Sequence, residues 1–187
     1  MNLAAASYTV TASSLHWLSA GTMIGCVGCV LKAQESPKED KGTWMFRHKS
    51  LGLLTGMIIA PRLAYRIFNR SAYKIEELAG ASSIEHILAK ISHGGLYAFM
   101  AIMPASGIAM GYYGGKGLPF FTTTLPGVVK TDENKKSTGE IAKQSYKIHK
   151  TLGTYGKYLI PLHAGAAATH SLRGHSIFAR INPFSRP

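Results

Sequence analysis

The residues of this 187-residue chain best suited to chemistry are histidines that lie within apolar stretches. His149 and His163 are separated by fourteen positions in one such stretch. On an α-helix this spacing covers about 21 Å and leaves the two side chains within about 40° of the same face. An imidazole inside lipid is costly unless its nitrogens find partners, so such histidines are candidates for metal ligation. The spacing therefore predicts two ligand positions on one helix face, at two depths.

Four stretches can position these histidines as membrane spans. A helix that crosses the hydrocarbon layer needs about twenty mostly apolar residues. Residues 2–31 and 91–115 contain no Asp, Glu, Lys or Arg. The other two stretches contain Lys or Arg, whose long stems can carry the charge to the interface. We therefore predict four antiparallel spans, at about 12–32, 48–68, 92–113 and 149–172.

These spans define the expected fold, an all-α, four-helix transmembrane bundle that forms one domain over residues 1–187. Residues 72–92 place apolar side chains among charges, a pattern typical of an amphipathic helix at the surface. We expect this short helix to connect spans two and three. The first fourteen residues contain no Lys or Arg, so a cleavable signal or transit peptide is not expected.

The composition also favours a membrane protein. Hydrophobic residues make up 46% of the chain and charged residues 16%, whereas charged residues make up about 25% of a typical soluble domain. The net charge of +12 suits a nucleic acid, an anionic membrane surface or an acidic partner protein. The chain contains no zinc-finger, helix-turn-helix or RNA-binding signature, so we expect no nucleic-acid partner. We interpret Cys26 and Cys29 as small buried residues.

The topology pairs four of the histidines. We call the membrane side on which span one begins the N-side, and the opposite side the loop side. His16 and His163 then meet near the N-side, while His48 and His149 meet near the loop side. Ligation of a haem b by two imidazoles fits each pair. The sequence thus predicts two haems at two depths of one bundle.

Two further histidines belong near the N-side. His93 begins span three there and competes with His16 for the same haem, a choice that spacing alone leaves open. His170 lies about two turns beyond His163 on nearly the same face, where it could line a pocket.

The spans resemble, in order, those of the bacterial-type cytochrome b-561 family and of the related cytochrome b subunits of hydrogenases and formate dehydrogenases. The resemblance is carried by four strings: LHWLSAGTMI, HKSLGLLTGMIIAPRLAYRI, SHGGLYAFMAIMPASGIAMGYYGG and HKTLGTYGKYLIPLHAGAAATHSL. It implies that His16 of the His-Trp pair, His48 of the His-Lys-x-Leu-Gly motif, His149 and His163 are the haem ligands. It also implies that His93, in a Ser-His pair that opens span three, is not one. Ser50 departs from the family, in which proline is common at that position.

The resemblance also implies a quinone pocket near the N-side haem, to which His93, His170 and Arg62 are expected to contribute. Arg62 near the N-side end of span two and Lys49 near its loop-side end are candidate partners for haem propionates, which need cations or hydrogen-bond donors. Lysines in the long loop-side connection could dock an acidic redox partner.

The leading hypothesis is a di-haem b electron carrier that exchanges electrons with quinone or quinol on the N-side. Whether it acts as a quinone-linked oxidoreductase stays open. A second hypothesis is a haem-containing accessory or anchor subunit of a larger respiratory complex. A third, a soluble haem-binding bundle, is disfavoured by the long uncharged runs. We expect a multi-pass protein of the bacterial cytoplasmic membrane or the mitochondrial inner membrane. The loop side carries more Lys and Arg than the N-side, opposite to the orientation that the resemblance implies.

Overall fold

The computed structural model describes residues 8–70, 82–175 and 177–184. Most of these residues are helical, as the sequence predicts. The elements are α1 (Val10–Glu35), α2 (Lys38–Phe68), α3 (Ser83–Tyr113), β1 (Leu118–Phe120), β2 (Thr123–Leu125), α4 (Lys135–Gly156), α5 (Leu159–Leu172) and α6 (Ile177–Arg180).

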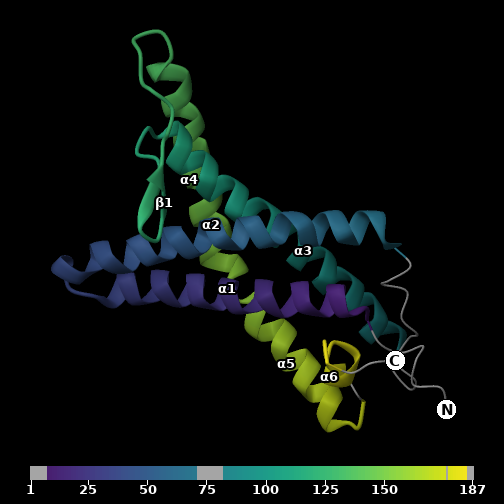
Figure 1. Cartoon of the computed structure of the whole chain (residues 1–187). Helices are drawn as coiled ribbons and strands as arrows, with labels where there is room; N and C mark the ends of the chain where they lie inside the picture. The colour runs from purple at the N-terminus through teal and green to yellow at the C-terminus, as the bar shows by residue number, and fades with distance from the viewer. Residues whose placement is uncertain (1–7, 71–81, 176, 185–187) are drawn as a thin grey trace.

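Helices α1 and α2 form a long antiparallel pair (Figure 1). Thr9 caps the start of α1, because its hydroxyl accepts a hydrogen bond from the Ala12 amide at 3.2 Å. Ser36 follows α1 and Pro37 caps α2, so the connection is shorter than the sequence predicts. Proline suits this position because it has no amide hydrogen to leave unpaired.

Three of the described helices, α1, α2 and α3, are long and apolar enough to cross a membrane. Helix α3 begins earlier than the predicted third span. Ser82 and Glu85 form a capping box there, in which each side chain accepts a hydrogen bond from the backbone amide of the other residue. Residues 83–92, the end of the predicted surface helix, are therefore the first turns of α3. The part of that prediction over residues 72–81 lies outside the described residues.

The predicted fourth span is not one continuous helix. Helix α4 ends at Gly156, and α5 begins at Leu159 after a turn at Lys157 and Tyr158. Pro161 explains the interruption, since it has no amide hydrogen to donate to the carbonyl of Lys157 and its ring crowds that carbonyl. The prediction of a single helix over 149–172 is therefore wrong, and His149 and His163 lie on two successive helices.

The all-α prediction also misses a small hairpin of β1 and β2, which pair antiparallel with Leu118 opposite Leu125. The hairpin packs against α2. Its turn residue Phe121 donates its amide to the hydroxyl of Ser50 at 3.0 Å, and Ser50 is almost fully buried. Ser50, at the position where the family commonly has proline, thus holds the hairpin two residues from His48.

The remaining helices pack around α3. Helix α2 lies against one side of α3, and Gly56 allows the approach, because a Cβ there would lie 3.2 Å from the Cβ of Pro104. Helix α4 packs along α3, and the α1–α2 pair crosses both in Figure 1. At the other end, the indole of Trp17 donates to the carbonyl of Ile181 at 2.8 Å, which ties the C-terminal segment to α1.

Candidate functional site

The loop-side pair consists of His48 on α2 and His149 on α4. Their ring centroids lie 6.1 Å apart, with the ring planes at 70°. The two histidines are 101 positions apart in the sequence (149 − 48), so the packing of α2, α3 and α4 brings their rings together rather than local spacing.

Backbone carbonyls fix the orientation of both rings in the loop-side pair. His48 Nδ1 lies 3.0 Å from the carbonyl oxygen of Cys26, and His149 Nδ1 lies 3.0 Å from that of Met103. A carbonyl can only accept, so each Nδ1 carries the proton and each Nε2 keeps its lone pair. This is the arrangement in which a histidine ligates a metal through Nε2 while a second residue holds its other nitrogen.

Gly107 lets the His149 ring lie against α3. A Cβ at this position would lie 3.1 Å from His149 Cε1 and 3.3 Å from Nδ1. A side chain at this position would therefore press on the His149 ring, which would have to give way by a few tenths of an ångström.

The N-side pair consists of His16 on α1 and His163 on α5, with ring centroids 6.3 Å apart. His93 on α3 joins this group, because its ring centroid lies 5.4 Å from that of His163. The structure therefore gathers three imidazoles where the sequence leaves the choice between His16 and His93 open.

Arg62 on α2 contacts the N-side pair directly. Its Nη2 lies 3.1 Å from His16 Nδ1, and its Nη1 contacts Ser19 Oγ and lies 3.4 Å from Met100 Sδ. Arginine can only donate, so His16 Nδ1 is the acceptor and a neutral His16 carries its proton on Nε2. Ligation through Nε2 requires the other tautomer, and Arg62 must then release His16.

Both pairs have the separation that one iron needs. A metal–imidazole bond is about 2.0–2.1 Å long and the ring centre lies about 1 Å beyond the nitrogen, so ligands on opposite sides of an iron place their centroids about 6 Å apart. The 6.1 Å and 6.3 Å separations match this value. The 5.4 Å between His93 and His163 is shorter. The residues present therefore fit a haem at each pair, with His16 a better partner for His163 than His93.

The other predicted site residues are divided between the two ends of the molecule. Lys49 follows His48 and its side chain is exposed. His170 has His175 as its ring neighbour, at a centroid distance of 5.8 Å. Its Nδ1 is buried without a hydrogen-bond partner among the described residues. Arg62 and His93 instead adjoin His16 and His163.

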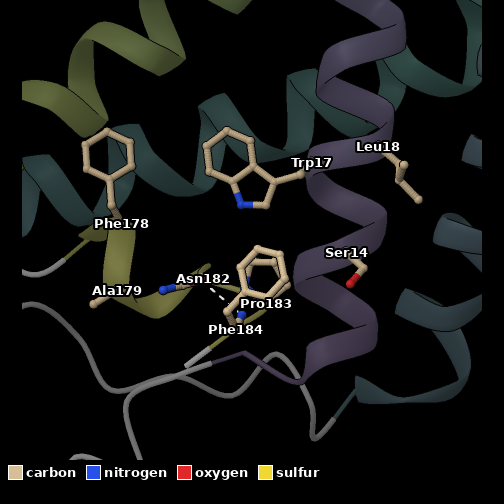
Figure 2. A pocket seen from close by; sticks show the side chains of 8 residues that line it. All are labelled: Ser14, Trp17, Leu18, Phe178, Ala179, Asn182, Pro183 and Phe184. Atoms are coloured by element: carbon tan, nitrogen blue, oxygen red, sulfur yellow. Dashed lines mark hydrogen bonds between the residues drawn. The ribbon is translucent and has the colours of Figure 1, made fainter. Parts of the chain in front are cut away.

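An aromatic cleft between α1 and the C-terminal segment is a feature that the sequence analysis missed. The volume of the cleft is about 920 Å³. One of its lining residues, Trp17, follows His16 in the sequence, and the ring centroids of these two residues lie 5.4 Å apart. Figure 2 shows Trp17 facing Phe178 and Phe184 across it. Only the fold brings residues 178–184 back to α1, so nothing in the local sequence signals the cleft. Its lining is Ser14, Trp17, Leu18, Phe178, Ala179, Asn182, Pro183 and Phe184.

A stripe of exposed lysines follows one face of α4. Steps of seven, four and three residues keep the four side chains within about 60° of one another on a helix. Glu140 is the one acidic residue of α4, and it accepts a hydrogen bond from Gln144. We call this set the α4 lysine stripe: Lys136, Lys143, Lys147 and Lys150.

Long apolar helices with two pairs of facing imidazoles define a class, the helical haem proteins of membranes. The particular family follows from the comparisons. A family model described as prokaryotic cytochrome b561 matches residues 7–183, and the chain belongs to this family. Its members bind haem b and carry electrons in membranes, so the chain is an integral membrane protein of electron transport. The comparison with curated proteins gave no match.

Proposed function

We propose that the protein is a di-haem b transmembrane electron carrier that links a quinone site on the N-side to the loop side. The observation that carries this proposal is the repeated spacing of the two pairs, His16–His163 and His48–His149, at the separation one iron requires. Haem b would supply a one-electron Fe(III)/Fe(II) couple at each pair.

Four spans are part of the proposal. Helix α5 has 14 residues, or about 21 Å, which is too short to cross a hydrocarbon layer of about 30 Å alone. Together with the last turns of α4 it reaches from 149 to 172, or about 35 Å. The carbonyl of Lys157, to which Pro161 cannot donate, can be tolerated where it faces other helices rather than lipid. We therefore infer a broken fourth span in a multi-pass protein of the bacterial cytoplasmic or mitochondrial inner membrane.

The two imidazoles of each pair would hold the iron of one haem, which would then serve electron transfer rather than the binding of oxygen or substrate. Their Nδ1 partners at the loop-side pair, the Cys26 and Met103 carbonyls, hold the rings in the ligating tautomer. Arg62 on the N-side and Lys49 on the loop side supply cations suited to haem propionates.

Quinone exchange on the N-side is supported by the aromatic cleft beside His16. A quinone ring is flat and apolar with two carbonyl acceptors, which suits a cleft of aromatic walls with a few polar groups at its edge. Asn182 and Ser14 are the polar side chains of the lining. His93 and His170 lie on α3 and α5 near the same end, and we propose that they exchange protons with the bound quinone.

An acidic redox partner on the loop side is supported by the α4 lysine stripe, which lies on the helix that carries His149. Exposed charges of one sign increase encounter rates with an oppositely charged partner more than they increase affinity. The same stripe would also suit an accessory or anchor subunit docked to a respiratory complex. The two functions differ in whether quinol alone can reduce the protein.

The experiment is spectroscopy of the purified, membrane-extracted protein. We expect two haems b per chain, both six-coordinate and low-spin, unaffected by carbon monoxide and reduced by a soluble quinol without any partner. One haem or none would contradict the di-haem proposal. Reduction that requires a tightly bound partner would favour the accessory subunit. Release of the protein from membranes by alkaline carbonate would contradict the proposed spans.

A further inference from the structure

In the loop-side pair, the Nδ1 atom of each imidazole has a second contact in addition to its backbone carbonyl, and the two second contacts are similar. Besides its carbonyl, each Nδ1 has one side-chain atom within reach. Cys26 Sγ lies 3.3 Å from His48 Nδ1, and Ser106 Oγ lies 3.2 Å from His149 Nδ1. Two helices, α1 and α3, therefore present the same combination of a backbone carbonyl and a side-chain acceptor.

Cys26 is oriented by its own hydrogen bond. Its thiol donates to the carbonyl of His48 at 3.4 Å. The sulfur lone pairs are then available to the Nδ1 proton of the same histidine, which the Cys26 carbonyl also accepts at 3.0 Å. Sulfur is a weak acceptor, so the thiol adds a small second component to the bond.

Ser106 has the corresponding arrangement on α3. Its hydroxyl donates back to the carbonyl of Ile102 at 2.7 Å or to that of Met103 at 3.0 Å. Either choice leaves its oxygen as an acceptor for His149 Nδ1. Ser106 is buried at 7% exposure, so water does not compete for this contact.

We propose that Cys26 and Ser106 are positioning residues that set the redox potential of the loop-side haem through the Nδ1 protons of His48 and His149. The inference rests on the proposed haem ligation. An acceptor at Nδ1–H makes an imidazole a more basic ligand. A more basic ligand stabilises the ferric state, and axial ligands and their hydrogen bonds are levers on haem potential. Stronger acceptors therefore lower the potential, and weaker ones raise it.

The test is a potentiometric titration of the purified protein followed in the haem absorption bands. The Cys26→Ala and Ser106→Ala variants lose an acceptor and should raise the loop-side potential, while Cys26→Ser gains a stronger acceptor and should lower it. Because the backbone carbonyls remain, each change in the reduction equilibrium should stay below about tenfold. The opposite shifts of Cys26→Ala and Cys26→Ser distinguish hydrogen bonding from a merely structural role.

Two controls accompany the variants. The N-side haem should keep its potential throughout, and Cys29→Ala, at a buried cysteine three residues further along α1, should move neither haem. The loop-side titration wave is identified by its loss in His149→Leu.

Two unchanged waves in Cys26→Ala, Cys26→Ser and Ser106→Ala, with both haems retained, would overturn the proposal. If Cys26→Ala or Ser106→Ala loses haem, the test uses Cys26→Ser and Ser106→Cys, which keep the approximate size of the side chain and an acceptor atom. The loop-side potential should fall in Cys26→Ser and rise in Ser106→Cys. A parent protein that holds no haem would instead contradict the proposed function itself.

Discussion

The two histidine pairs are alike in spacing and different in what holds them. At the loop-side pair, Nδ1 of both His48 and His149 faces a backbone carbonyl. At the N-side pair, Nδ1 of His16 faces the guanidinium of Arg62 instead. The loop-side rings are thus set in the tautomer that ligates a metal, whereas His16 must first be released by Arg62. Ring spacing therefore identifies the candidate ligands, while the group that faces Nδ1 determines whether each imidazole already has the tautomer that can ligate a metal.

The two ends of the molecule also differ in the cations that lie near their histidine pairs. A cation near a haem favours the reduced iron, which carries one positive charge fewer, and the low dielectric of the interior strengthens the effect. Arg62 lies within the N-side group, while Lys49 beside the loop-side pair is exposed to solvent. We therefore expect the N-side haem to have the higher potential, so that electrons collect at the end that borders the aromatic cleft.

The largest effect is expected for substitutions at the N-side, where His16 and His93 both lie near His163. The His16→Leu variant should lose one of the two haems, because it removes the partner at the 6.3 Å separation. The His93→Leu variant should keep both haems and slow only reduction by quinol. A pyridine haemochrome assay counts the haems. Loss of a haem in His93→Leu but not in His16→Leu would reverse the assignment.

A smaller effect is expected when the charge of Arg62 is removed. Arg62→Gln should lower the potential of the N-side haem by about 60 mV, which is tenfold in a one-electron equilibrium. The loop-side potential should not move. Arg66→Gln is the comparison variant, since Arg66 lies one turn further along α2 and the two guanidinium groups lie 5.9 Å and 5.8 Å from the Tyr97 ring centroid. Only Arg62 also contacts His16 Nδ1 directly in the contacts described above, so Arg66→Gln should shift the N-side potential by less. Equal shifts for both haems would show that Arg62 does not distinguish the two ends.

Charge reversal on the α4 lysine stripe should affect only exchange at the loop side. In the Lys143→Glu/Lys147→Glu variant, oxidation by ferricyanide, an anion, should slow about threefold to tenfold at low ionic strength. Oxidation by a cationic cobalt complex should accelerate, and both effects should fade in about 1 M salt, where screening is strong. Stopped-flow absorption measures the rates. Unchanged rates with both oxidants would mean that electrons do not leave the protein beside the stripe.

The smallest effect is expected at the ion pair that joins the N-side ends of α3 and α5. Arg173 Nη1 lies 2.5 Å from Glu85 Oε1, and the two side chains are 62% and 30% exposed. Glu85→Gln keeps the capping box and removes the charge, so Tm should fall by less than about 2 °C with both haems retained. Loss of the N-side haem in this variant would show that α5 depends on this ion pair for its position.

The sequence predicts the features of the molecule that depend on hydrophobic periodicity and residue type. The uncharged runs give α1 and α3, and antiparallel threading gives the two pairs His16–His163 and His48–His149. These features can be predicted because a membrane span must be mostly apolar over about twenty residues and helical throughout, which leaves a long pattern in the sequence.

Other features depend on single atoms that the sequence pattern does not resolve. Pro161 interrupts the fourth segment at Lys157. Ser50 holds the β1–β2 hairpin, whose sequence lacks the alternation of apolar and polar residues that would predict strands. The carbonyls of Cys26 and Met103 are backbone groups, so no residue type signals that they face Nδ1. The cleft at Trp17 exists because the C-terminal segment returns to α1, a tertiary contact without a local motif.

The most direct test of two separate ligand pairs is a haem count in three variants, His149→Leu, His163→Leu and the double variant. We predict two haems per chain in the parent, one in each single variant and none in the double variant. The two single variants should lose different titration waves, the lower-potential one in His149→Leu and the higher-potential one in His163→Leu. Two haems with unaltered spectra in either single variant, or loss of the same wave in both, would contradict the account.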